Sequence, residues 1–99
     1  MADFDKLLAR LAAESPEAWL LEPRDVYDRC LIDVEIGPSL DPPDRLIAVY
    51  GVELCVEAIK AWLECDETDA LEWFSFNTAG AWIGPLTPAF RWQRSGLWY

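Results

Sequence analysis

Carboxylates are the side chains of this sequence that are best suited to bind a charged partner, and seven of them lie in one stretch. Residues 53–72 hold a single base, Lys60, and the acids Glu53, Glu57, Glu64, Asp66, Glu67, Asp69 and Glu72. Four residues of an α-helix rise about 6 Å, and one nucleic-acid strand carries a charge about every 3.4 Å of axis. Such a row presents negative charge at a density near that of a phosphate backbone. The chemistry it predicts is binding to a cationic groove that otherwise holds nucleic acid.

Two plainer interpretations of the same acids stay open. Lys60 can pair with Glu57 and Glu64, and residues 66–69 have the sequence of a helix cap with an acidic first turn. An acidic surface also keeps a protein soluble, whatever its function.

The charge of the chain is unevenly distributed. The formal net charge is −10, and all eighteen acids lie in residues 1–72. Residues 73–99 contain no acid, two arginines and eight of the aromatic side chains. A field of this sign repels nucleic acid and anionic membranes, so we expect a basic protein surface as the partner and no direct contact with either.

The residue types that most catalytic sites need are missing. There is no histidine, which excludes Ser-His-Asp and Cys-His arrangements, and no glycine-rich phosphate loop. The acids at 66–69 lack the glycine and the final glutamate of a calcium-binding loop. Cys30, Cys55 and Cys65 are an odd number without CxxC spacing, and the first two have apolar neighbours typical of a core. We expect a protein that is not an enzyme and has no metal or cofactor.

The elements that position these residues follow from apolar periodicity. Helical spacing runs through residues 4–11, 26–34 and 52–64, and a further helix is expected after Asp66, with Gly80 as its stop. Residues 32–36 also alternate as a strand does, but helix is favoured for 26–34. Residues 45–50 and 89–92 predict strands, and GPSLDPPD at 37–44 predicts a turn. We predict an α+β fold over 1–99: a small, mostly helical single domain with a small antiparallel sheet.

The expected compartment follows from two absences in the sequence. The N-terminus reads MADFDKLL, with acids where a signal peptide carries bases. No apolar run approaches the roughly 20 residues of a membrane span. We expect a cytoplasmic protein with no membrane partner.

The stretch DALEWFSFNTAGAWIGPLTPAF at 69–90 resembles a pattern of small phage and prophage proteins of mostly unassigned function, roughly EAxEWFxFNxxGAWxGxxTPxF. The matching positions are Ala70, Glu72, Trp73, Phe74, Phe76, Asn77, Gly80, Ala81, Trp82, Gly84, Thr87, Pro88 and Phe90. The loop at 37–44 and the extension RWQRSGLWY at 91–99 depart from that pattern. Core and turn roles are expected for the motif residues.

The resemblance implies a phage context, and small acidic phage proteins resemble anti-defence proteins such as anti-CRISPR proteins. The function predicted is therefore a phage-encoded inhibitor in the host cytosol. It would use the seven carboxylates to mimic DNA on a nucleic-acid-binding host protein such as a Cas protein. The alternative is an adaptor or structural phage protein, monomer or homodimer, that binds through its aromatic C-terminal tail with Trp98 and Tyr99 as the contact patch.

Overall fold

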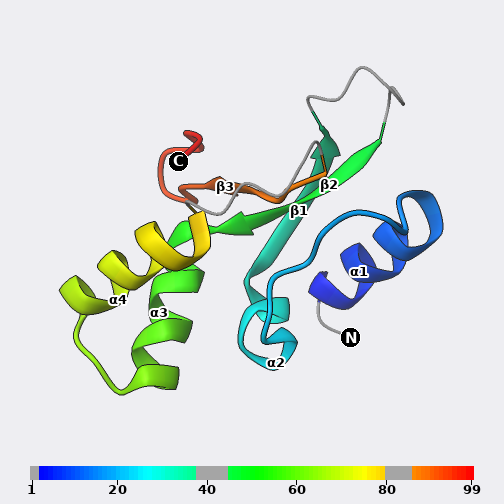
Figure 1. Ribbon diagram of the computed structural model, residues 1–99. Coiled ribbons are helices and arrows are strands. Elements are labelled where there is room, and N and C mark those ends of the chain that lie inside the picture. Colours follow the sequence, from blue (N-terminus) through cyan, green and yellow to red (C-terminus); the bar gives the residue numbers. More distant parts are fainter. Residues whose placement is uncertain (1–2, 38–44, 80–85) are drawn as a thin grey trace.

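A three-stranded sheet in the order β1–β2–β3 lies at the centre of the fold, with helices around it (Figure 1). The computed structural model describes residues 3–37, 45–79 and 86–99. Its elements are, in chain order, α1 (Asp3–Glu14), α2 (Arg24–Tyr27), a 3₁₀ turn (Asp28–Cys30), β1 (Leu31–Ile36), β2 (Leu46–Gly51), α3 (Val52–Leu63), α4 (Glu67–Trp73), a π-helical turn (Phe74–Ala79) and β3 (Ala89–Arg91). The predicted α+β class is confirmed. Residues 38–44 of the turn expected at 37–44, and the stop expected at Gly80, lie outside the described residues.

The sheet is mixed, whereas an antiparallel sheet was predicted. β1 runs antiparallel to β2, with Val34 opposite Ala48, but β3 runs parallel to β2, with Tyr50 opposite Phe90. A parallel neighbour needs a crossover connection, and α3 and α4 lie in that connection. The crossover therefore fixes the direction of β3.

The predicted helix at 26–34 is wrong over its second half. Helical backbone ends at Cys30, and Leu31–Ile36 forms β1. The apolar residues here fit both periods, and pairing with the buried strand β2 selects the extended form. A bulge between Leu31 and Asp33 corrects the register, so that Leu31 and Val34 both lie in the core.

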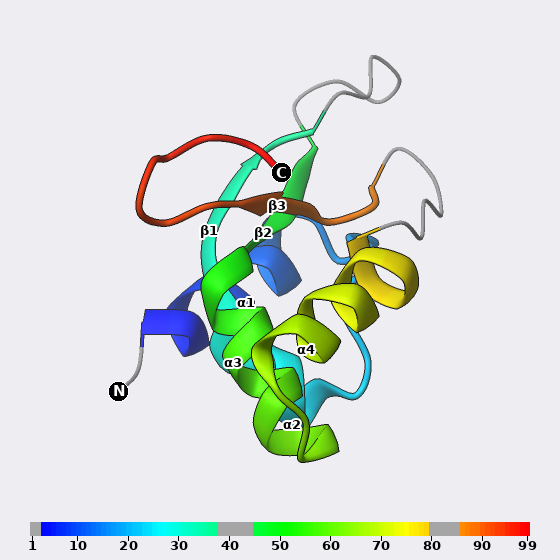
Figure 2. The same ribbon diagram turned by 90° about the vertical axis from the view of Figure 1, so that its left-hand side faces the viewer.

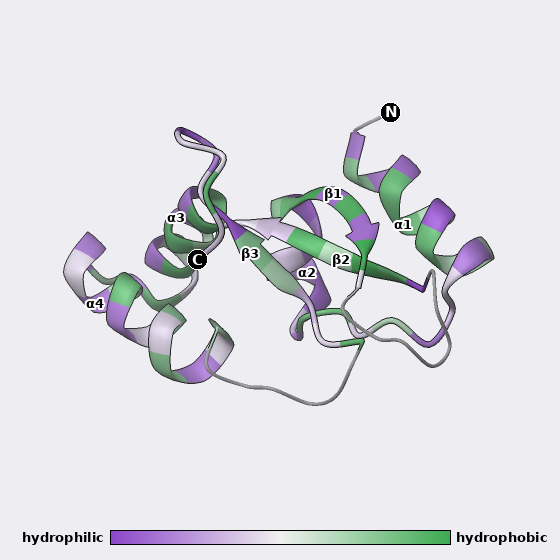
Figure 3. Ribbon diagram, turned by 90° about the horizontal axis from the view of Figure 1, so that it is seen from above, coloured by the Kyte–Doolittle hydropathy of each residue, from purple (hydrophilic) through white to green (hydrophobic). Residues whose placement is uncertain are grey.

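The core forms where the helices meet one face of the sheet. All residues of β2 are buried, and Figure 3 shows hydrophobic character along this strand. Leu11 of α1 and Ile59 of α3 belong to the same core. Cys30 and Cys55 are fully buried, which confirms their predicted core role.

The helices predicted at 4–11 and 52–64 are confirmed as α1 and α3, and they lie at opposite ends of the sheet. α4 packs beside α3, at the same end of the sheet (Figures 1 and 3). After β3 the chain turns back toward that strand (Figure 2), and the backbone N–H of Tyr99 donates to the carbonyl of Phe90 at 2.8 Å. None of the helices in the described ranges combines the length and apolar character of a membrane span.

Candidate functional site

The helix α3 presents its acids along one flank. Val52, Cys55, Val56 and Ile59 are buried and hold the helix against the sheet. Glu53, Glu57 and Lys60 then share the neighbouring flank, because residues three and four apart lie on one side of a helix. The Lys60 ammonium lies 3.3 Å from Glu57, whose side chain is 66% exposed. This confirms one of the two pairings that the sequence suggested for Lys60.

The segment between α3 and α4 carries acids with structural roles. Glu64 ends α3 in the left-handed conformation, with φ 54°. Asp66 caps α4, because its carboxylate accepts a hydrogen bond of 2.8 Å from the backbone N–H of Asp69. Glu67 and Asp69 then lie in the first turn, where the helix dipole favours negative charge.

Most of these acids are exposed and lack a basic partner. Within the described ranges, no ion pair includes Glu64, Asp66, Glu67, Asp69 or Glu72. All five are exposed, at the end of the molecule that α3 and α4 form. Their charge is therefore available to a partner.

Glu53 has a different role, because it holds the C-terminal tail (residues 92–99). Its carboxylate accepts hydrogen bonds from the backbone N–H groups of Gln93, at 2.8 Å, and Arg94, at 3.2 Å. Partial desolvation acts to raise the pKa of Glu53, but these hydrogen bonds and the charge of Arg94 outweigh it and lower the pKa. Of the seven predicted contact residues, Glu53 is the one whose carboxylate is used inside the fold to hold this tail.

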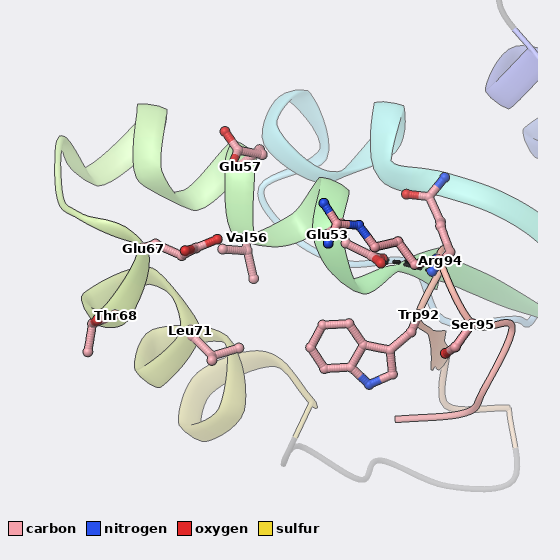
Figure 4. A pocket seen from close by; sticks show the side chains of 10 residues that line it. Glu53, Val56, Glu57, Glu67, Thr68, Leu71, Trp92, Arg94 and Ser95 are labelled. Atoms are coloured by element: carbon pink, nitrogen blue, oxygen red, sulfur yellow. Dashed lines mark hydrogen bonds between the residues drawn. The ribbon is translucent and has the colours of Figure 1, made fainter.

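A groove of about 840 Å³ opens between α3, α4 and the tail (Figure 4). Its lining residues are Glu53, Val56, Glu57, Glu67, Thr68, Leu71, Trp92, Gln93, Arg94 and Ser95. In Figure 4 the carboxylate of Glu67 points from α4 toward α3, and the indole of Trp92 projects from the tail toward Leu71. The Arg94 side chain extends toward α3 beside Glu53.

The seven predicted residues thus fall into two sets. Three line the groove: Glu53, Glu57 and Glu67. The other four lie outside it: Glu64, Asp66, Asp69 and Glu72. Trp92 was missed as a site residue, because the sequence shows it only as the end of a strand and gives no sign that the tail returns to α3.

The alternative patch, Trp98 and Tyr99, is folded onto the protein. Tyr99 packs edge-on against Phe74, with ring centroids 5.2 Å apart, and its hydroxyl lies 2.6 Å from the Ser75 hydroxyl. The Trp98 ring covers the guanidinium of Arg91 at 5.5 Å. Both side chains remain about half exposed, at 55% and 49%. They stabilise the tail and still offer surface to a partner.

The phage-like motif divides between core and surface. Phe74 is fully buried, and Trp73 packs edge-on against Trp62 at 5.9 Å. The core role expected for Phe76 is wrong, because its side chain is 82% exposed. Residues two apart point to different sides of a helical turn, so Phe76 faces away from the side that Phe74 occupies.

Searches for related proteins return no matching family model, no similar curated protein and no similar solved structure. The resemblance to phage proteins therefore stays a prediction. Within the described ranges, no group of three or more Cys, Asp or Glu side chains is placed to hold a metal ion. The site is defined by its geometry: an acidic end and an acid-lined groove with an aromatic wall.

Proposed function

We propose that this chain is a phage-encoded, non-enzymatic inhibitor that binds a lysine- and arginine-rich surface of a bacterial nucleic-acid-binding defence protein. The α3–α4 end occupies the groove in which that protein holds DNA or RNA. The partner class follows from the resemblance of residues 69–90 to phage proteins, and a Cas protein is the expected member of that class. The proposed setting is the host cytoplasm.

One observation carries the proposal: five exposed acids cluster at the α3–α4 end without basic partners in the described ranges. Like charges three or four residues apart on a helix destabilise it by a few tenths of a kcal/mol per pair. Binding a cationic groove offsets that cost, releases counterions and accelerates association.

Competition with nucleic acid tests the proposal. The protein is immobilised, host lysate is passed over it at about 0.1 M salt, and bound proteins are eluted at about 0.5 M salt and identified. The captured protein is then purified, and its affinity for DNA or RNA is measured with and without the inhibitor. We expect a nucleic-acid-binding protein whose affinity falls as the inhibitor is added.

A triple variant tests whether exposed carboxylates outside the groove carry the competition, at positions where the fold does not depend on their charge. Glu64→Gln, Asp69→Asn and Glu72→Gln together should abolish most of the competition, because they neutralise three exposed carboxylates. A captured protein that keeps its full nucleic-acid affinity, or one that stays bound at high salt, would contradict DNA mimicry.

Apolar docking is the second candidate, and it has its own supporting observation. Phe76 is 82% exposed, Leu97 66% and Trp98 55%, although large apolar side chains are costly to leave in water. An adaptor that docks through these residues would bind its partner with little dependence on salt. Phe76→Ser and Leu97→Ser would then remove binding, whereas the acidic variants would keep it.

A further inference from the structure

The groove between α3, α4 and the tail combines apolar walls with carboxylates. We propose that it binds one arginine side chain, presented by an exposed segment of the partner protein. This inference rests on the proposed function, because it takes the partner's surface to be cationic. It adds a specific site for one guanidinium to the general attraction of the acidic end.

Charge complementarity identifies the occupant as a cation. Three carboxylates, those of Glu53, Glu57 and Glu67, line the groove against the one guanidinium of Arg94, which leaves a net charge of −2. Glu53 is engaged by backbone N–H groups of the tail, so Glu57 and Glu67 are the lining carboxylates that are left for an incoming group. Among the described residues Glu57 pairs only with Lys60, in an exposed contact of 3.3 Å that a guanidinium can replace at a cost of about 0–1 kcal/mol.

The apolar walls favour arginine over a small cation. Val56, Leu71 and the indole of Trp92 can cover the methylene groups of a long side chain. The backbone of Trp92 is fixed, because its N–H donates to the Leu97 carbonyl and its carbonyl accepts from Gly96, both at 2.8 Å. Its indole lies beside the Tyr99 ring, with the ring centroids 5.9 Å apart. A planar guanidinium stacks on an indole and pairs with carboxylates through its fork of donors, whereas an ammonium is a hydrated point charge.

The same protein already holds one arginine in this way. The Arg91 guanidinium lies 5.5 Å from the Trp98 ring centroid and within 3.2 Å of Asp33 and 3.5 Å of Glu35. One indole and two carboxylates therefore suffice to bind a guanidinium on this scaffold. The groove offers the same set of groups in Trp92, Glu57 and Glu67.

The size of the groove fits a side chain with part of its backbone. Ligand pockets in proteins span roughly 300–1,000 Å³, and this groove measures about 840 Å³. It therefore admits an arginine together with its neighbouring residues, as a loop or strand edge of a partner would present them.

Chemical-shift mapping by NMR tests the site on the full chain. The probe is a short capped peptide with one central arginine between glycine and serine residues. Its titration should shift the indole N–H signal of Trp92 and the amide signals of Glu57, Glu67 and Leu71. A peptide with citrulline, the neutral counterpart of arginine, should cause none of these shifts, and a lysine peptide should bind several-fold more weakly.

Two double variants that remove the same charge distinguish binding in the groove from general electrostatic attraction by the acidic end. Glu57→Gln with Glu67→Gln should weaken arginine-peptide binding at least about tenfold, since two charge-assisted hydrogen bonds are lost. Glu64→Gln with Glu72→Gln removes the same charge outside the groove and should change the affinity less than about twofold, as expected of screened, distant charges.

Two results would overturn the inference. One is an absence of shifts at the groove residues, and the other is an equal loss of affinity in both double variants. Either would leave the proposed function standing, because a diffuse acidic end can still compete with nucleic acid. Conversely, arginine-peptide binding at the groove without any competition for nucleic acid would refute DNA mimicry and keep the site.

Discussion

The carboxylate of Glu53 on α3 accepts a hydrogen bond of 2.8 Å from the backbone N–H of Gln93, forty residues later in the chain. This contact joins the acidic helix to the aromatic tail and so forms one wall of the groove. The two regions that the sequence offered as alternative interaction surfaces are therefore parts of one structure.

Acidification should release the tail. Since the pKa of Glu53 is lowered in the fold, its contribution to stability is complete above the unfolded pKa and is lost as the pH falls through the folded pKa. Hydrogen-exchange protection at Gln93 and Arg94, corrected for intrinsic rates, should therefore be constant down to about pH 5 and fall from there toward about pH 3, because an unfolded glutamate has a pKa of about 4.3. In Glu53→Gln the protection at these two amides should be low and nearly independent of pH. A wild-type tail that stays protected at the lower pH would refute this role.

Tyr99 should contribute more to stability than Trp98, although they are neighbours with similar exposure. Tyr99 packs on Phe74 and bonds to Ser75, whereas Trp98 covers Arg91 at the surface. We expect Tyr99→Ala to cost about 1–3 kcal/mol, below the 3–5 kcal/mol of a fully buried aromatic, and Trp98→Ala about 0.5–1 kcal/mol. Urea unfolding of both variants measures the difference. Equal losses would mean that the tail does not pack as described.

The hydroxyl of Tyr50 should contribute to the stability of the fold in addition to the contribution of its ring. Tyr50 is fully buried in β2, and its hydroxyl accepts a hydrogen bond of 3.0 Å from the backbone N–H of Leu21. Tyr50→Phe leaves that N–H without an acceptor, at a cost of about 1–3 kcal/mol. Tyr99→Phe makes the same chemical change at an exposed hydroxyl and should cost less. Denaturant unfolding compares the two, and an equal cost would contradict the assignment.

The sequence predicts those elements whose local signals agree. α3 has a long apolar stripe, and Asp66 precedes α4 with a side chain suited to capping, so both helices are predictable. β1 is not, because its apolar residues satisfy helical and strand periods equally, and only the pairing of Val34 with Ala48 decides between them. The direction of β3 is likewise set by the crossover and not by its own residues.

The candidate site is predictable only in part, because some of it also depends on contacts between residues far apart in the sequence. The acids of α3 and α4 stand out by composition alone, and the structure places most of them at the surface as expected. The groove depends on Glu53 meeting the backbone of Gln93 and on Trp92 turning toward Leu71. Backbone N–H groups are the same at every residue except proline, so the sequence carries no mark of such a contact.

Glu64 provides a test of whether the acidic end is retained for binding. It ends α3 at φ 54°, a conformation in which glycine is favoured and a side chain is strained. Glu64→Gly should therefore stabilise the fold by about 0.5–1 kcal/mol, because relief of the left-handed backbone, about 1–2 kcal/mol, exceeds the extra chain entropy of glycine, and denaturant unfolding measures the gain. The same variant should compete less well for the partner, because one exposed carboxylate is removed. Glu64→Gln is the matched control: it loses the charge without relief of the backbone, so its competition should fall equally while its stability does not rise by this amount.

Unchanged competition in both variants would remove Glu64 from the binding surface. Reduced competition in the glycine variant alone would indicate that the shape of the turn, and not its charge, is what the partner recognises. A gain in stability together with a loss of binding in Glu64→Gly is the result we expect if Glu64 belongs to the binding surface, because the backbone strain would then be kept for the sake of the carboxylate.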